Sequence, residues 1–564
     1  MDDPLSFIVY RLSSIVKSAT TKQPTMKSII SAPQPIAVDE AVRVLQRGGN
    51  AIDAAVTCAF AQAVVDPQMC GIGGYALLTA QLAGQPEPIG FDAPALAGSK
   101  TSPEMWQNRV IGMNPDGWGY FLRDKVNDAG YTSICAPGTV TMLAHMLEKW
   151  GTISWAQAIE PAARLAEDGW QVHETLSRQW RTPAGYPEAC SQLEYILRNA
   201  EARKIYLKPD GSAYLTGETI CNPDYARTLR HLAKHGADDF YTGELAAKMS
   251  ADLEASGAYV IASDFANYKL RPAPPTRGAY RGHEVASSTA PHGGATLIAI
   301  LNILEHFEIG KLGHNSPEYI LLVSQAMKAA FADRNRFMAD AAFVDVPLGW
   351  MTSRERAAEW AEHIRAGKPI TQSNTPTGTP HTTTISVVDG LGNCVALTHS
   401  LGSSSGVITP GLGFMYNNSM VNFDPLPGGA NSIAPGKGRT TGMSPTIVYK
   451  NGKPVMVLSA PGASRIITGV LQVMLNVIDF GMPIAEAVLA PRFDCQIGEI
   501  RCQRRIPSFV LDEVRKRHPI SHIPQSHGQM GLVHAITIDP HTGALAGGAD
   551  SGGDGMAVLV ESDG

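Results

Sequence analysis

The stretch HTTTISVVDGLGNCVALTHS, residues 381–400, places three threonines between a histidine and two segments of strand character. The segments TTISVVD and CVALTHS are rich in β-branched residues and are joined by GLGN, so they are expected to pair as a hairpin. Residues 366–381, AGKPITQSNTPTGTPH, carry three prolines and no apolar period, which is typical of an exposed loop. The threonines therefore stand where a loop meets the first strand of a sheet.

Two interpretations fit three threonines at this place. One is a run of residues with high β propensity at the start of a strand. The other is chemical, because a threonine hydroxyl is a weak nucleophile that needs a neighbouring base. Cleavage of the bond before a threonine frees its own amine, whose ordinary pKa is about 7.7–8.0, beside the hydroxyl. His381 and His399 are close in sequence, but no G-x-S-x-G elbow accompanies them, and the local sequence leaves both interpretations open.

The composition limits the classes of partner. The 564 residues are 44% hydrophobic and 17% charged with a net charge of -6, which is typical of an ordinary globular protein with a large core. Lys and Arg do not cluster, so the expected partner is a small molecule rather than nucleic acid or a membrane. The eight cysteines form no CxxC pair, the sixteen histidines form no HExxH motif, and no GxGxxG is present. We therefore expect no disulfide framework, no metal and no cofactor.

The first residues carry no targeting signal that we recognise. Residues 1–25 show no sustained periodicity and are expected to form an N-terminal extension. They open with two aspartates and are interrupted by Arg11, unlike a secretory signal. The most apolar stretch, residues 51–65, is shorter than the ~20 residues that a membrane-spanning helix needs. A cytoplasmic protein is the expectation.

The chain changes character near residue 380. Apolar spacing predicts two helices within residues 36–65, the second of them buried, and a glycine turn predicts a hairpin within residues 71–93. Helical patterns dominate residues 140–368, whereas the sequence after residue 381 consists mainly of short apolar segments joined by Gly, Asn and Asp turns. We expect an α+β protein with a mainly helical part before a mainly β part.

The chain resembles the γ-glutamyltransferase family of N-terminal-nucleophile hydrolases from about Pro33 to Val560. This resemblance implies a four-layer αββα sandwich formed by two chains that arise when the precursor cleaves itself between His381 and Thr382. It implies a large chain of residues 26–381 after the extension and a small chain of residues 382–564, and it allows a homo-oligomer of such heterodimers. The motifs that carry it, in family order, are VLQRGGNAIDAAV, GIGGYALL, APGTV, AMKAAFADRNRFMADAAFVDVP, HTTTISVVDGLGNCVALTHSLG, MSPTIV, PGASRIITGVLQVMLNVIDFG and ADSGGDGMA.

The same resemblance assigns the catalytic positions. Thr382 is implied as the nucleophile, with its own amine as base, and Ser400 matches the family's threonine that contacts this hydroxyl. Gly462 and Ala463 match the residues whose backbone N–H groups hold the oxyanion, and Ala463 replaces a family glycine without changing the donor. Thr398 and Asn393 match positions that brace the site.

The positions that recognise the γ-glutamyl group depart from the family pattern. The family's carboxylate-binding arginine stands in a DFRE-like turn, whereas this chain reads GFDAP with Asp92 at or near that place, and a carboxylate there reverses the sign of the interaction. Four further places differ together. Gly402 stands where the family has a residue that contacts the α-amine of the substrate. Asn422 stands in place of the family's acidic partner for that amine, and Ser419 in place of the amide or acidic residue near it. Thr441-Gly442 stands in place of a serine pair.

Two readings of these changes compete. In one, other groups such as Arg439 or Arg465 have taken over the carboxylate of a γ-glutamyl substrate, although Arg465 also fits a framework salt bridge. In the other, which we favour, the enzyme transfers another acyl group to water, because a site built for a charged amino acid loses affinity when its paired charges are deleted. A third possibility of another class is an inactive binding protein that kept the fold. His292 is expected in a tight turn near the pocket rather than on a metal ion.

Overall fold

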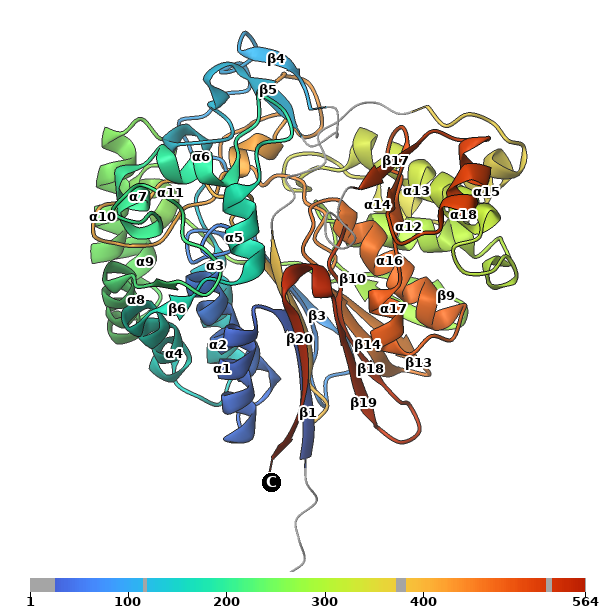
Figure 1. The fold of residues 1–564 in the computed structure, drawn as a ribbon, viewed down its shortest axis with the longest axis horizontal. Coiled ribbons are helices and arrows are strands. Elements are labelled where there is room, and N and C mark those ends of the chain that lie inside the picture. Colours follow the sequence, from blue (N-terminus) through green and yellow to red (C-terminus); the bar gives the residue numbers. More distant parts are fainter. Residues whose placement is uncertain (1–25, 115–118, 372–381, 524–529, 563–564) are drawn as a thin grey trace, which may run out of the picture.

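The structure, a computed structural model, describes residues 26–114, 119–371, 382–523 and 530–562. Two β-sheets pack face to face, and a layer of helices covers the outer face of each sheet (Figure 1). The four layers form the αββα sandwich expected from the sequence.

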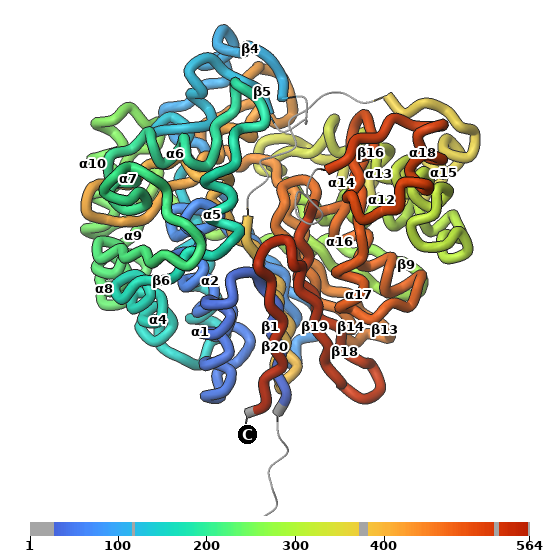
Figure 2. Tube along the Cα trace, viewed as in Figure 1, coloured from blue at the N-terminus to red at the C-terminus, as the bar shows by residue number. Residues whose placement is uncertain are grey.

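The first sheet is antiparallel and has seven strands in the order β20-β1-β11-β12-β2-β3-β8. Its two central strands, β11 and β12, are the hairpin predicted from the threonine stretch. Strands β1 and β20 come from opposite ends of the chain and lie side by side (Figure 2). They pair over eight residues. The bounds are β20 (Gly555–Ser562), β1 (Met26–Pro33), β11 (Thr383–Val388), β12 (Cys394–Ser400), β2 (Tyr75–Gln81), β3 (Ile89–Ala93) and β8 (Arg271–Pro272).

The second sheet has six strands in the order β19-β18-β14-β13-β10-β9, also antiparallel. Side chains from both sheets, such as Ala396 of the first and Val457 of the second, share one apolar cluster that fills the space between them. The bounds are β19 (Leu545–Ala549), β18 (His534–Ile538), β14 (Lys453–Ser459), β13 (Thr446–Lys450), β10 (His283–Ser287) and β9 (Thr276–Tyr280).

Eleven described helices lie on the side of the first sheet. The second of them, α2, was predicted to be buried, and all fifteen of its residues are, with Asn50 and Asp53 forming a capping box at its start. The bounds are α1 (Pro35–Gln46), α2 (Ala51–Val65), α3 (Thr139–Trp150), α4 (Trp155–Asp168), α5 (Glu174–Arg181), α6 (Gln192–Leu197), α7 (Ala200–Tyr206), α8 (Pro223–His235), α9 (Asp239–Thr242), α10 (Glu244–Ala255) and α11 (Ala262–Ala266).

The helices of the other layer come from two distant parts of the chain (Figure 1). They share one core with the outer face of the second sheet. The bounds are α12 (Gly294–Leu304), α13 (Pro317–Phe337), α14 (Leu348–Met351), α15 (Arg354–Arg365), α16 (Arg465–Ile478), α17 (Ile484–Leu489) and α18 (Ser508–Arg515).

Short elements complete the described chain. Three small sheets are formed by β4 (Val110–Met113) with β5 (Tyr120–Leu122), by β6 (Trp170–Gln171) with β7 (Thr219–Ile220), and by β15 (Phe493–Asp494), β16 (Ile500–Gln503) and β17 (Ile520–Ile523). Single 3₁₀ turns are η1 (Arg123–Lys125), η2 (Tyr131–Ser133), η3 (Ile309–Lys311), η4 (Ser419–Asn422) and η5 (Ser551–Gly553).

The helices within residues 36–65, the hairpin within residues 71–93 (β2 and β3) and the hairpins after residue 381 are confirmed. The predicted extension, residues 1–25, and most of the predicted loop, residues 372–381, lie outside the described residues. Among the residues that are described, none of the helices is long and apolar enough to cross a membrane.

Candidate active site

Thr382 is the last residue before β11 and is almost buried, with 6% of its surface exposed. Its Oγ1 donates a hydrogen bond to Ser400 Oγ at 3.2 Å. The pairing explains the contact, because Thr383 lies opposite His399 and the next pair along the hairpin is Thr382 with Ser400. The backbone N–H of Gly402, which has a left-handed φ of 76°, donates to the same Ser400 Oγ at 2.9 Å.

The three threonines have different surroundings because successive side chains of a strand point to opposite faces. Thr383 faces the helical layer, where its Oγ1 donates to Gln34 Oε1 at 3.1 Å. Thr384 faces the space between the sheets, donates to Leu397 O at 3.0 Å and lies 3.3 Å from Thr398 Oγ1. Thr382 lines the cavity described next, whereas Thr383 and Thr384 do not line that cavity.

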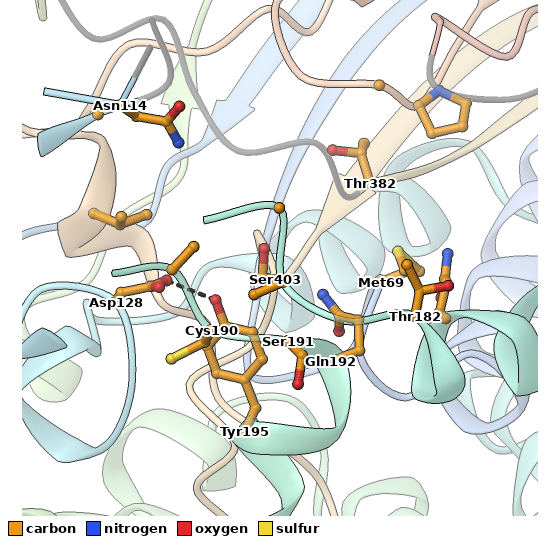
Figure 3. Close-up of a pocket in the computed structure, with 18 of the residues that line it drawn as sticks. Met69, Asn114, Asp128, Thr182, Cys190, Ser191, Gln192, Tyr195, Thr382 and Ser403 are labelled. Atoms are coloured by element: carbon orange, nitrogen blue, oxygen red, sulfur yellow. Dashed lines mark hydrogen bonds between the residues drawn. The ribbon is translucent and has the colours of Figure 1, made fainter. Parts of the chain in front are cut away.

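The cavity beside Thr382 has a volume of about 420 Å³. Figure 3 shows Thr382 at one end, with Ser403 and Gln192 across from it and Asp128 and Tyr195 at the far end. The Tyr195 hydroxyl donates to Asp128 Oδ1 at 2.7 Å. This volume is within the range of small-molecule sites, so the nucleophile candidate lies where a substrate can reach it.

The turn before α16 contains the two backbone donors predicted from the sequence, and one of them lies at the cavity. Gly462, with φ of 135°, lines the cavity, and Ala463 follows with a left-handed φ of 57°. A Cβ at residue 462 would lie only 2.9 Å from Gly531 Cα, so the close packing of this turn requires glycine. The described residues include no acceptor for the N–H of Gly462 or of Ala463, and both lie at the N-terminal end of a fourteen-residue helix. Such donors favour a developing negative charge.

A buried polar network lies beneath the threonines. Gln34 has a left-handed φ of 62°, accepts from Gln62 Nε2 at 2.9 Å and donates to Asp66 Oδ2. His399 Nε2 lies 2.8 Å from Gln62 Oε1. Together with the bond from Thr383 to Gln34, these contacts tie the residue after Thr382 to helices α1 and α2.

Asp66 brings a carboxylate to the cavity wall. Its Oδ1 is buried without a partner, and burial raises its pKa to about 6 despite the opposing effects of His173 and Gln34. Burial lowers the pKa of His173, but the hydrogen bond to Asp554 and the charge of Asp66 raise it above its ordinary value. The His173 Nδ1 atom lies 2.8 Å from Asp554 Oδ2, and the hydrogen bonds from His173 and Thr175 hold the pKa of Asp554 at about 2 against the effect of burial.

The residues predicted to recognise the acyl group fall into two groups in the structure. Asp92, on β3, lies 3.0 Å from His292 Nε2, and His292 Nδ1 lies 2.8 Å from Thr441 Oγ1. Arg334 donates to the carbonyls of both His292 and Thr441. Asp92 and Thr441 thus belong to one buried network with these two residues, and neither lines the cavity of Thr382.

The second group, Ser419, Asn422 and Arg439, surrounds a different buried place. Asn431 connects Asn422 with the residue after Arg439, because its Nδ2 donates to Asn422 O at 2.6 Å and its Oδ1 accepts from Thr440 N at 3.3 Å. Ser419 and Asn422 are the ends of η4, whose Val421 lines the cavity of Thr382.

Gly442 packs directly against the turn that contains Gly462 and Ala463. A Cβ at this position would lie 2.0 Å from Ala463 O, so a serine here is incompatible with the turn as it stands. Arg465, the first residue of α16, is buried and lines the cavity. Asn393 lies at the opposite end of the β11–β12 hairpin, where it accepts from Ala83 N and donates to Asp389.

Comparison with known proteins places this geometry in a family. The gamma-glutamyltranspeptidase family model matches residues 37–560. The chain belongs to this family. It is 34% identical to the "Acylase ACY 1 proenzyme" of Pseudomonas sp. (strain SE83) over 552 residues, covering 95% of this chain and 94% of that protein. It is 32% identical to the "Glutathione hydrolase proenzyme" of Escherichia coli (strain K12), covering 94% and 90%.

Solved structures agree with the assignment. Cephalosporin acylase from Bacillus halodurans superposes with a TM-score of 0.83 at 27% identity and covers 99% of both chains. The Helicobacter pylori gamma-glutamyltranspeptidase superposes with a TM-score of 0.53 at 31% identity, covering 60% of this chain and 91% of that one. The protein is therefore an enzyme of the N-terminal-nucleophile amidohydrolase or acyltransferase type. The proenzyme names and the match of a separate chain to part of this one fit two chains from one precursor.

Sequence reasoning did not find the polar residues of the cavity wall in this family member. Asp66, His173, Asp128 and Tyr195 stand in four separate segments and carry no shared motif. A local indication of Asp66 was the DPQ tripeptide directly after α2. A buried helix that ends in an aspartate needs a polar partner for that carboxylate. The described residues include no cluster of His, Cys, Asp and Glu that could hold a metal ion.

Proposed function

We propose that the protein cleaves itself between His381 and Thr382 and then hydrolyses a small-molecule amide through Thr382. The observation that carries the proposal is the hydrogen bond from Thr382 Oγ1 to Ser400 Oγ at the wall of a substrate-sized cavity. His381 lies outside the described residues. The products of self-cleavage are then a large chain ending at His381 and a small chain of residues 382–564, held together by the shared sheet of β1, β11 and β20.

The chemistry follows from a freed Thr382 amine. This amine accepts the proton of Oγ1 while Oγ1 attacks the substrate carbonyl, and it then donates the proton to the leaving amine. The N–H groups of Gly462 and Ala463 stabilise the oxyanion, and one such donor is typically worth about 3–4 kcal/mol. Water repeats the sequence on the Thr382 ester, releases the acid and restores the enzyme.

The acyl group in this proposal differs from a standard γ-glutamyl group. Five residues at the positions that differ from the family pattern carry no charge: Gly402, Ser419, Asn422, Thr441 and Gly442. The sixth, Asp92, contacts His292. An α-ammonium group therefore has no carboxylate at position 422, where Asn422 stands. Relatives of the same family named acylase indicate that the family is not confined to glutathione.

A second candidate is a genuine γ-glutamyltransferase or glutathione hydrolase. It is favoured by Arg439, a buried arginine that could hold the α-carboxylate of a glutamyl group. The third candidate, an inactive binding protein, is disfavoured by an intact pair of Thr382 with Ser400 and an intact oxyanion turn.

Intact-mass measurement of the purified protein tests the first step. Two masses that join at Thr382 are expected, whereas the Thr382→Ala variant is expected to stay a single chain. Persistence of the wild type as one full-length chain contradicts the proposal and favours the inactive candidate. Release of p-nitroaniline from γ-glutamyl-p-nitroanilide, with and without a dipeptide acceptor, separates the other two candidates, since robust turnover supports the γ-glutamyl enzyme.

A further inference from the structure

Asp128 places a carboxylate at the end of the cavity that lies opposite Thr382 (Figure 3). Its Oδ1 accepts hydrogen bonds from the Tyr195 hydroxyl at 2.7 Å and from Asn418 Nδ2 at 3.0 Å. Burial raises the pKa of Asp128, although these hydrogen bonds and the charge of Lys125 oppose the effect. No described Lys, Arg or His forms an ion pair with it. A partly buried carboxylate that lines a cavity without a counter-ion is a candidate partner for a cationic ligand.

Two basic side chains near Asp128 are held by another carboxylate. Lys125 Nζ lies 3.0 Å from both carboxylate oxygens of Glu194, and Arg198 Nη2 donates to Glu194 Oε1 at 2.6 Å. A carboxylate has about four acceptor positions, and Asp128 uses three of them for Tyr195, Asn418 and a backbone N–H. One position therefore stays open to a ligand. Three arginines also line the cavity and form no ion pair with Asp128: Arg178, Arg465 and Arg501.

Aromatic side chains line the same cavity, and the segments that carry them contact the loop of Asp128. Asn127, the residue before Asp128, donates its side-chain N–H to Tyr120 O at 3.0 Å, which ties β5 to this end. The next residue of β5, Phe121, has its ring centroid 5.9 Å from that of Tyr186. A carboxylate among aromatic rings is a combination that binds organic ammonium groups. The aromatic residues that line the cavity are Tyr120, Phe121, Tyr186 and Tyr195.

The cavity is separate from the positions where the family pattern places contacts to the acyl group. None of those positions lines it, whereas Thr382 and Gly462, which act on the carbonyl in the proposed mechanism, do. An amide extends from its carbonyl carbon in two directions, and the half that the acyl positions do not hold is the amine. The cavity is therefore the place for the amine half. The acyl positions are Asp92, Gly402, Ser419, Asn422, Thr441 and Gly442.

We propose that the cavity binds the amine half of the substrate and that Asp128 recognises a second, cationic nitrogen on it, so that the substrates are amides of short diamines. This inference rests on the proposed function and names the class of amine that is released. Thr382 Oγ1 bonds to the carbonyl carbon, the bond to nitrogen breaks, and the nitrogen leaves with the proton of the hydroxyl. Water then releases the acid from Thr382. The distal ammonium group donates to Asp128 throughout, and the aromatic rings contact its charge.

Calorimetric titration of the self-processed enzyme with diamines and matched monoamines tests the site without requiring turnover. Putrescine is compared with pentylamine and cadaverine with hexylamine, because each monoamine has a methyl group in place of the distal ammonium. At about 0.15 M ionic strength, long-range attraction of a dication to the protein's net charge is largely screened. We expect Kd for the better diamine to be about tenfold lower than Kd for its monoamine, since the distal ammonium gains a carboxylate and aromatic contacts.

Variants assign the preference to its residue. Asp128→Asn keeps the shape of the side chain and is expected to reduce the ratio of the two Kd values to about twofold or less, while Asp128→Glu keeps part of it. Asp252→Asn is the matched control. Asp252 is also a half-buried aspartate that accepts from a tyrosine hydroxyl, that of Tyr131 at 3.3 Å, but it does not line the cavity. This control removes the same charge and is expected to keep the wild-type ratio.

Turnover gives a second readout of the same preference. γ-Glutamyl and glutaryl amides of cadaverine are compared with the same amides of hexylamine by measuring the released amine. For the acyl group that is hydrolysed, we expect KM for the cadaverine amide to be about tenfold lower, and Asp128→Asn is expected to remove the difference chiefly by raising KM. Equal KM values for the two amides contradict the inference and leave the proposed function standing.

Equal Kd values of diamine and monoamine for the wild type overturn the inference without any variant. A diamine preference that survives in Asp128→Asn overturns it as well, and so does its loss in Asp66→Asn alone, because Asp66 is a second carboxylate of the cavity wall. Should the protein neither cleave itself nor hydrolyse any amide, the proposed function fails. The calorimetric ratio then still decides whether Asp128 binds the distal ammonium of a diamine.

Discussion

Thr382 donates its hydroxyl hydrogen bond to Ser400, the residue that lies opposite it across the β11–β12 hairpin. The register of the β11–β12 hairpin fixes the distance between the two side chains. Ser400 is itself held by the N–H of Gly402, so the acceptor of the Thr382 hydroxyl has a defined position before any substrate arrives. Preorganisation of this kind suits the role of nucleophile that we propose for Thr382.

Removal of the Ser400 hydroxyl is expected to lower kcat by about ten- to a hundredfold, because the nucleophile loses its orienting partner. Self-cleavage of Ser400→Ala is expected to slow as well, which a time course of intact mass measures. Ser400→Thr restores the hydroxyl and is expected to remain within about threefold of the wild type. Full activity of Ser400→Ala would show that the contact is not used.

If the turn of Gly462 and Ala463 binds the oxyanion, a substitution at Gly462 is expected to lower kcat. Gly462→Ala forces a Cβ to within 2.9 Å of Gly531 Cα at a φ of 135°, so the turn and its N–H groups must shift. The loss of one oxyanion donor lowers kcat by about a hundredfold or more, with a smaller effect on KM. Gly498→Ala is the control, because a Cβ there meets nothing within 4 Å. Similar rates for both variants would contradict the assigned role.

The sequence was sufficient where the determining contacts are local. The β11–β12 hairpin and the buried helix α2 follow from alternation, turn residues and apolar composition within single segments. The pairing of Thr382 with Ser400 follows in turn from the register of that hairpin.

The sequence was insufficient where a contact joins distant segments. The bond from Thr383 to Gln34 spans 349 positions, and the pair of Asp92 with His292 spans two layers of the sandwich. A polar side chain at a recognition position looks the same in the sequence whether it faces a substrate or a buried histidine. That difference depends on packing, which local patterns do not encode.

The buried network below the nucleophile predicts a stability effect. Gln34→Leu removes the hydrogen-bond partner of Thr383 Oγ1 and of Asp66 Oδ2, whereas Gln62 Nε2 keeps Pro33 O at 3.2 Å as an acceptor. Each buried group left unsatisfied costs about 1–3 kcal/mol, so we expect a loss of about 2 kcal/mol or more in the free energy of unfolding. Chemical denaturation of the Thr382→Ala single chain measures it, with exposed Gln171→Leu as the control. A loss below about 1 kcal/mol would show that water replaces Gln34.

Asp66 predicts a dependence of stability on pH with a defined sign. Its pKa in the folded protein, about 6, lies above the ordinary value of 3.8, so the folded state favours the protonated form. Protonated Asp66 therefore stabilises the folded state fully below about pH 4. This stabilisation is lost as the pH rises through about 6, which lowers the free energy of unfolding by at most about 3 kcal/mol.

Asp66→Asn stays neutral, so its Tm relative to the wild type is expected to rise between pH 4 and pH 8. Asp554→Asn is the control of opposite sign, because the pKa of Asp554 is held at about 2. That variant is expected to be less stable than the wild type at neutral pH, and the difference is expected to shrink as the pH falls below about 4. A Tm difference for Asp66→Asn that does not change with pH would refute the role of its charge.

Asn422→Asp tests by gain of function whether residue 422 contacts the acyl group, as predicted from the sequence. The connection through Asn431 places residue 422 beside Arg439, and an aspartate there offers an α-ammonium group the partner that it lacks. We expect kcat/KM for γ-glutamyl-p-nitroanilide to rise by about tenfold, since a new charge pair in a buried site is worth about 1–2 kcal/mol. Turnover of glutaryl-p-nitroanilide, which lacks the amine, is not expected to rise. Asn418→Asp, whose side chain already contacts Asp128, is the control for added charge and is expected not to raise γ-glutamyl turnover. A parallel change of both substrates in Asn422→Asp would mean that residue 422 senses folding rather than the acyl group.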